Sequence, residues 1–183
     1  YIGTITKNRN IIGMLEAIDS IQDAEVSLRL AGDFPVICDE NTARSHPGWS
    51  RVHYDGWVSR EGIANILAST RAGLVVLKPL EHEAVSFPIK LFEYMAAGLP
   101  LISSDFPVWR DIIEDAGCGL LVDPLNPEDI AKAIRWVIDH PDKAQSMGTR
   151  GRRAVLTKYN WENEVEVLFQ LYERIMVGSR NAL

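Results

Sequence analysis

Short apolar runs alternate with segments of helical periodicity from Tyr1 to Val122. The runs predict six strands, at Tyr1–Ile5, Val26–Ala31, Arg51–Tyr54, Gly73–Leu77, Leu99–Ser103 and Gly119–Val122. The intervening segments predict helices at Ile11–Ile21, Arg60–Ser69, Pro88–Ala97 and Val108–Asp115, with a further short helical piece at Asp39–Ser45. Such alternation is typical of βα units on a parallel sheet. The sequence therefore predicts an α/β fold, a Rossmann-like, doubly wound sheet of six parallel strands.

Only helices follow the sixth strand. Asn126 supplies an N-cap before Pro127, Pro141 starts a second helix that runs to about Thr157, and Trp161–Met176 forms the last. Gly148 and Gly151 permit close packing of the second of these helices. We expect residues 1–177 to form one domain, residues 178–183 to form a frayed tail, and part of the last helix's apolar stripe to be exposed.

Composition limits the classes of function. The 183 residues are 46% apolar and 24% charged, which is ordinary for a globular domain, and the net charge of −6 argues against nucleic-acid binding. Cys38 and Cys118 have no CxxC partner and are expected to be small buried hydrophobes in a reducing, cytoplasmic compartment. No signal peptide or membrane-spanning run is legible, although a peripheral membrane contact stays open. The chain begins on an apolar run without an initiator Met, so we expect it to be cut from a longer protein.

The stretch Ser86–Ser104 reads as a short helix that leads into a strand. Ser86 is a good N-cap, Pro88 suits the first helical turn, and Gly98 suits the left-handed residue after a helix end. Lys90 lies in the first turn, where the open N–H groups and the positive end of the helix dipole favour an anion. Glu93, about one turn on, has the acceptors to bind a vicinal diol such as a ribose. This pattern predicts a nucleotide-binding helix.

Glu93 also has a plainer interpretation, as a solvated helix former in a weak ion pair with Lys90. Against this interpretation, the helical wheel places Glu93 on one face with Ile89, Phe92 and Ala96, where a carboxylate among apolar neighbours needs a partner.

The first βα turn has one glycine, Gly3, and therefore lacks the GxGxxG fingerprint of NAD and FAD sites. Thr4, Thr6, Lys7 and Arg9 follow it, at the carboxyl edge where doubly wound sheets bind ligands. The turn is either a phosphate site or a solvated polar turn.

Other polar clusters leave alternatives open. In the loop Lys78–Phe87, the residues Glu81, His82 and Glu83 form either an acid/base cluster or a mobile acidic lip. Trp57 either flanks a base or packs in the core, and Asp105 is most simply a helix N-cap. The other histidines, His46, His53 and His140, lack metal-ligand spacing, so we expect no metal and no cofactor.

Several segments of the chain resemble a known protein family. The segment FPIKLFEYMAAGLP, with YIGTITKNRN, LRLAGDF, VHYDGWVSREGIANILA and YNWENEVEVLFQLYERI, resembles the C-terminal half of family-four glycosyltransferases, the retaining GT-B class. The resemblance implies one half of a GT-B fold that holds the nucleotide-sugar donor. It also implies an N-terminal domain, which mainly holds the acceptor and which we expect to be absent from this chain.

The same resemblance implies roles for single residues. It places the ribose-binding carboxylate of the Glu-x7-Glu motif on Glu93 and a phosphate-binding cation on Arg9, beside the turn residues Gly3 and Thr4. Diphosphate-binding amides fall on Phe87, Pro88, Ile89, Lys90 and Leu91, and the base lies near Trp57 and Val58. Two positions depart from the pattern: Val85 replaces the first glutamate of the motif, and Thr4 replaces the usual Arg. Glu83 is then a candidate contact to the transferred sugar.

These implications predict a retaining transferase that moves a hexosyl-type sugar from an NDP-sugar to a glycan, lipid-linked or other acceptor, as in cell-surface polysaccharide biosynthesis. The fragment alone is expected to be inactive. Two alternatives stay open, an NDP-sugar epimerase on the same fold and a non-catalytic nucleotide-binding Rossmann module.

Overall fold

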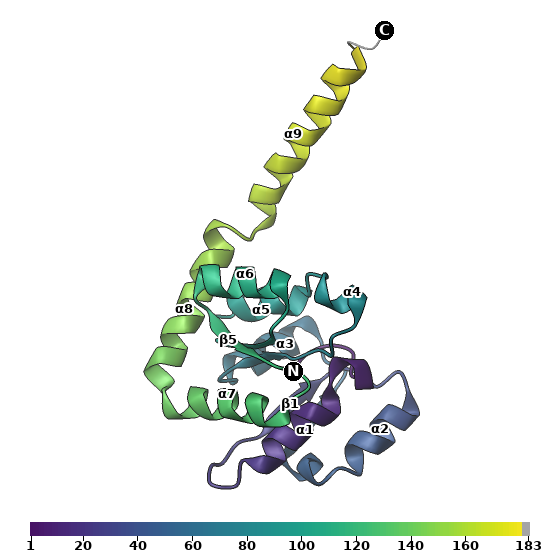
Figure 1. The fold of residues 1–183 in the computed structure, drawn as a ribbon, viewed down its shortest axis with the longest axis vertical. Coiled ribbons are helices and arrows are strands. Elements are labelled where there is room, and N and C mark those ends of the chain that lie inside the picture. Colours follow the sequence, from purple (N-terminus) through teal and green to yellow (C-terminus); the bar gives the residue numbers. More distant parts are fainter. Residues whose placement is uncertain (181–183) are drawn as a thin grey trace.

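The computed structural model describes the backbone of residues 1–180 and the side chains of residues 1–176. Its strands are β1 (Leu28–Ala31), β2 (Val52–Gly56), β3 (Gly73–Val75), β4 (Leu101–Ser104) and β5 (Gly119–Val122). Its α-helices are α1 (Ile11–Ser20), α2 (Ile37–Arg44), α3 (Arg60–Ala68), α4 (Glu81–Ala84), α5 (Ile89–Ala96), α6 (Pro107–Ala116), α7 (Pro127–Asp139), α8 (Pro141–Thr157) and α9 (Trp161–Arg180). Two 3-10 helices, η1 (Lys7–Arg9) and η2 (Pro47–Arg51), complete the order shown in Figure 1.

All strand pairs are parallel, as predicted, but the strands form two sheets in place of one. β1 pairs with β2, and β3, β4 and β5 pair in that order, whereas the first run contributes a single bridge between Ile2 and Ala31. The predicted continuous six-stranded sheet is therefore wrong in detail. The N–H of Ile2 donates to the hydroxyl of Tyr94 at 2.8 Å, so a side chain takes the place of a backbone partner at this position.

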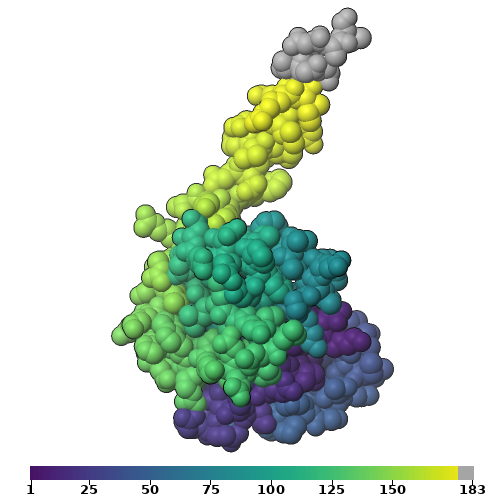
Figure 2. Space-filling model, viewed as in Figure 1, coloured from purple at the N-terminus to yellow at the C-terminus, as the bar shows by residue number. Residues whose placement is uncertain are grey.

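Helices cover both faces of the sheets, and two apolar cores result (Figure 1). One core contains side chains of α1, β1 and α7, including Met14, Leu15 and Ile134. The other contains side chains of α5, β4 and α6, including Leu91 and Trp109. Figure 2 shows a compact body formed by these layers, from which α9 extends. This doubly wound arrangement places the strand ends and their following loops at one edge.

Two helix starts differ from the prediction. The N-cap of α5 is Pro88, because proline fixes its own φ and restricts the preceding residue to extended backbone. Ser86 instead donates its hydroxyl to the carbonyl of Glu83, which closes α4. Likewise Phe106, just before Pro107, is the N-cap of α6, and Asp105 pairs with Arg110. In both cases a proline determines where the helix begins.

The C-terminal helices follow the sequence more closely. Asn126 caps α7 by accepting hydrogen bonds from the N–H groups of Glu128 and Asp129, as predicted. α9 continues to Arg180, so the first three residues of the predicted frayed tail are helical, and residues 181–183 lie outside the described residues. The apolar stripe of α9 is exposed, as expected, with Trp161, Phe169 and Tyr172 among its accessible side chains. No helix in the described part of the chain is both long and apolar enough to cross a membrane.

The two cysteines differ in their exposure to solvent. Cys118 is fully buried, and this burial raises the pKa of its thiol to about 11. Cys38 is exposed, contrary to expectation, because the short helix α2 directs Asp39 and Ala43 inward.

Candidate anion-binding site

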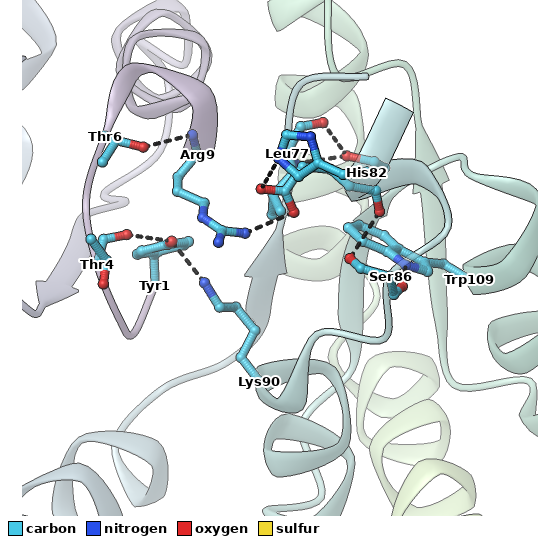
Figure 3. A network of polar contacts seen from close by, with 11 residues as sticks. Tyr1, Thr4, Thr6, Arg9, Leu77, His82, Ser86, Lys90 and Trp109 are labelled. Atoms are coloured by element: carbon cyan, nitrogen blue, oxygen red, sulfur yellow. Dashed lines mark hydrogen bonds and ion pairs between the residues drawn. The ribbon is translucent and has the colours of Figure 1, made fainter. Parts of the chain in front are cut away.

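Lys90 lies in the first turn of α5 and contacts the start of the chain. Its Nζ donates to the hydroxyl of Tyr1 at 2.7 Å and lies 4.1 Å from the centre of the Tyr1 ring. The Tyr1 hydroxyl in turn donates to the carbonyl of Thr4 at 2.8 Å (Figure 3). A Cβ on Gly3 would lie 3.4 Å from Lys90 Nζ, so glycine gives the ammonium group room at this turn. The predicted pairing of Lys90 with Glu93 is absent from the described residues.

The surroundings of Lys90 favour an incoming anion. Burial above all, and repulsion from Arg9 in addition, lower its pKa to about 8 against the opposing effects of Glu83 and Glu93. A partly desolvated ammonium group next to a second cation gains more from an anion than a fully hydrated one does. The amino end of α5 therefore holds two neighbouring cations, Lys90 and Arg9.

Arg9 is held by a structured turn. The N–H of Arg9 donates to Thr6 Oγ1 at 3.3 Å, and the N–H of Lys7 donates to Asp39 Oδ2 at 2.8 Å. Asn10, buried and left-handed at φ 59°, donates its side-chain amide to the carbonyl of Pro124 at 2.7 Å. These contacts fix the backbone beneath Arg9, while Thr4 and Lys7 are exposed, so both interpretations of the turn, a phosphate site and a solvated polar turn, stay open.

The Arg9 guanidinium pairs with Glu83 across the site. Arg9 NH1 lies 3.0 Å from Glu83 Oε2, and Glu83 is only 7% exposed. Glu83 belongs to α4, a helical turn inside the loop that was predicted to be a mobile acidic lip. Glu81 and His82 are exposed, as expected of an acidic lip. Glu83 is buried, so the prediction is wrong for this residue. Figure 3 shows Arg9 reaching from η1 toward this segment.

The amino end of α5 offers open backbone donors. Within residues 1–176, the N–H groups of Phe87, Ile89 and Lys90 have no acceptor. Pro88 has no N–H, and the N–H of Leu91 already donates to the Pro88 carbonyl at 3.0 Å. Three amides are thus left to bind an anion beside Lys90.

Glu93 lies about one turn further along α5. It is exposed, and its carboxylate makes no hydrogen bond or ion pair within the described residues. The helical-wheel argument for this carboxylate is wrong, because Ile89 and Ala96 are also exposed and the helix buries Leu91, Tyr94 and Met95 instead. Glu93 is nonetheless accessible to a ligand bound at the mouth of α5.

Trp57 and Val58 follow β2 at the same edge. Trp57 is 74% exposed, which excludes the core-packing alternative, while Val58 packs partly against the second core. The strand ends approach closely here: a Cβ on Gly32 would lie 2.1 Å from the Gly3 carbonyl, so only glycine fits at that position. Within the described residues, neither Trp57 nor Val58 makes a hydrogen bond or ring contact with Arg9 or Lys90.

Sequence reasoning missed Tyr1 and Asn10 as parts of this site. The role of Tyr1 depends on a contact with a residue 89 positions away, which no local pattern reveals. Asn10 had a local signal, since asparagine directly before a helix tolerates left-handed backbone better than most residues do. In the described residues no group of three or more His, Cys, Asp or Glu side chains is placed to hold a metal ion.

Fold and site together define a Rossmann-like α/β domain with a candidate anion site at the amino end of a helix. Residues 1–154 match the model of the family described as "Glycosyl transferases group 1", and the chain belongs to this family.

Similar proteins agree with this assignment. The chain is 27% identical over 98% of its length to a GDP-mannose-dependent alpha-(1-6)-phosphatidylinositol dimannoside mannosyltransferase of Mycobacterium tuberculosis, of which it covers 45%. It superposes on sucrose-phosphate synthase from Thermosynechococcus elongatus with a TM-score of 0.81 at 22% identity, over 97% of this chain and 45% of that one. For Anabaena Alr3699/HepE in complex with UDP-glucose the TM-score is 0.77 at 16% identity, over 96% of this chain and 48% of that one. The predicted α/β fold of GT-B type is confirmed, and the chain spans less than half the length of these proteins.

Proposed function

We propose that this chain is the donor-binding half of a retaining, family-four glycosyltransferase, which moves a hexosyl-type sugar from an NDP-sugar to an acceptor. One observation carries the proposal: Arg9, Lys90 and three open amides meet at the amino end of α5. Membership of the glycosyltransferase group 1 family supports it, and so does the likeness to a protein whose structure contains UDP-glucose.

In this proposal the donor diphosphate lies against Arg9, Lys90 and the N–H groups of Phe87 and Ile89. Negative charge develops on the diphosphate as it leaves the sugar, and fixed cations and amides aimed at that charge lower the barrier. Glu93 accepts hydrogen bonds from the ribose hydroxyls, and the base lies beside Trp57. No residue of the described chain is assigned as an acid or base, which sets this proposal apart from an epimerase.

The remaining parts of the reaction belong to the same proposal. The acceptor, a glycan or a lipid-linked sugar, binds an N-terminal domain that this chain does not include. The chain alone is then inactive but still binds nucleotide. A cytoplasmic location, at the inner face of a membrane or away from it, stays a prediction.

The test is calorimetric titration of the chain with UDP, GDP and ADP. One of the three is expected to bind, and Glu93→Ala is expected to weaken it by about 10- to 30-fold, because two hydrogen bonds to a carboxylate are lost. Glu114→Ala is the matched control, since Glu114 is also exposed on a helix. Absence of binding by all three nucleotides contradicts the proposal, and binding indifferent to Glu93→Ala contradicts the ribose assignment.

A further inference from the structure

We propose that Glu83 is a positioning residue, which orients the Arg9 guanidinium toward the donor diphosphate and does not itself contact the transferred sugar. The inference rests on the proposed function, because it takes a diphosphate as the ligand of Arg9. It replaces the expectation that Glu83 stands in for the glutamate missing at Val85.

The ion pair is asymmetric in its exposure. The Glu83 side chain is 9% exposed and that of Arg9 is 32% exposed, with 3.0 Å between Oε2 and NH1. The carboxylate is therefore enclosed, whereas the guanidinium still reaches the surface. Of its five N–H donors, the guanidinium uses one within the described residues. The others remain for a ligand, and a planar guanidinium held at one edge presents them in a fixed direction.

α4 is tied down on both sides of Glu83. The N–H of Glu83 donates to the Leu80 carbonyl at 2.9 Å, and Ser86 Oγ donates to the Glu83 carbonyl at 3.0 Å. The carbonyl of Ser86 in turn accepts the indole N–H of Trp109 at 2.6 Å, and Trp109 is fully buried in the second core (Figure 3). These contacts hold the backbone of α4, so the carboxylate can move only by rotation of its side chain, and a rotation away from Arg9 would break the ion pair.

Glu83 also offsets repulsion between the positive charges of the site. Arg9 and Lys90 repel each other, and the positive end of the α5 dipole adds to the repulsion. A buried carboxylate paired with Arg9 offsets this repulsion, and it uses only one of the guanidinium donors within the described residues. The opposite arrangement is also testable: if Glu83 filled the diphosphate position, the ligand would have to displace it, and removing Glu83 would strengthen binding.

A double-mutant cycle tests the proposal. The dissociation constant of whichever of UDP, GDP and ADP binds is measured for the chain, for Glu83→Ala, for Arg9→Met and for the double variant, with the matching nucleoside titrated in parallel. Glu83→Ala is expected to weaken diphosphate binding by about 10-fold, and Glu83→Gln by only about 3-fold because its amide oxygen still accepts from Arg9. In the Arg9→Met background, Glu83→Ala is expected to change nothing. Nucleoside affinity stays unchanged throughout.

Asp115→Ala is the control, since it removes a carboxylate from an exposed ion pair with Lys158, 2.7 Å apart. Thermal unfolding of each variant shows that it folds, and Glu83→Gln keeps the side-chain volume if the alanine variant does not fold. Tighter or unchanged binding by both Glu83 variants overturns the proposal, as does an equal loss in the Arg9→Met background. If the unaltered chain binds none of the three nucleotides, the proposed function fails before any variant is compared, and this inference fails with it.

Discussion

Lys90→Met is expected to lower the affinity of the chain for its nucleoside diphosphate by about 100-fold near neutral pH. Methionine keeps much of the side-chain volume, so the loss reports the charge. The effect is larger than that of Glu93→Ala, because Lys90 faces the most negative part of the ligand from a partly buried position. Isothermal titration of both variants gives the comparison, and Lys132→Met, on the outer side of α7, is the matched control.

The same lysine makes binding depend on pH. The pKa of Lys90 in the free protein is lowered to about 8, mainly by burial. A bound diphosphate favours the charged form and raises that pKa, so binding takes up a proton wherever the free lysine is neutral. Affinity is therefore constant well below pH 8 and falls above it, by up to about tenfold per pH unit, until the pKa of the bound state is passed.

Proton uptake distinguishes this linkage from a general loss of affinity. Titrations at about pH 8.5 in two buffers of different ionisation enthalpy are expected to show uptake of a fraction of a proton by the unaltered chain and none by Lys90→Met. Equal uptake by the two proteins would assign the proton to another group. Affinity that rises with pH would contradict the placement of Lys90 against the diphosphate.

How much of this site can be predicted from the sequence depends on how far apart along the chain the contacting residues lie. Lys90 is indicated by a local signal, the first turn of a capped helix, and Arg9 by a polar βα turn together with the family resemblance, and the parallel topology brings both to one edge. Their contacts with Glu83 and Tyr1 join residues 74 and 89 positions apart, and packing alone determines these contacts. The sequence also indicated that the loop before α5 was polar, but nothing in it distinguished buried Glu83 from exposed Glu81.

Prolines explain several boundary errors, and one aromatic residue explains the divided sheet. Pro88 and Pro107 move the helix starts past Ser86 and Asp105, an effect that residue preferences for N-caps do not include.

Tyr94 was predicted as an ordinary helix residue. Its ring lies against Gly73, where an added Cβ would be 2.2 Å from the ring carbon Cδ2, and its hydroxyl takes the N–H of Ile2. Gly73 at the start of β3 leaves room for the Tyr94 ring, and the Tyr94 hydroxyl takes the place of a backbone hydrogen-bond partner for Ile2.

Gly148→Ala is expected to lower the free energy of unfolding by about 3 kcal/mol, although alanine is the better helix former by about 1 kcal/mol. A Cβ on Gly148 would lie 1.9 Å from the Gly98 carbonyl oxygen and 2.7 Å from its carbon, both backbone atoms. Gly98 is left-handed at φ 74°, and its N–H donates to the Met95 carbonyl at the end of α5. Neither side of the contact moves cheaply, so α8 must shift away from α5.

Gly151, the second glycine of α8, gives a milder substitution to compare with Gly148→Ala. A Cβ on Gly151 would meet the Cβ of Cys118 at 3.0 Å and Met95 Cγ at 3.5 Å, which are much less close than the contacts at Gly148. Gly151→Ala is therefore expected to cost about 1 kcal/mol or less, and Thr149→Ala, at an exposed position of α8, to stay within about 0.5 kcal/mol. Urea unfolding followed by circular dichroism measures all three. A Gly148→Ala variant as stable as the unaltered chain would mean that α8 does not pack on the turn that ends α5. Because α5 carries Lys90, the same shift is expected to weaken nucleotide binding in Gly148→Ala and to leave it unchanged in Thr149→Ala.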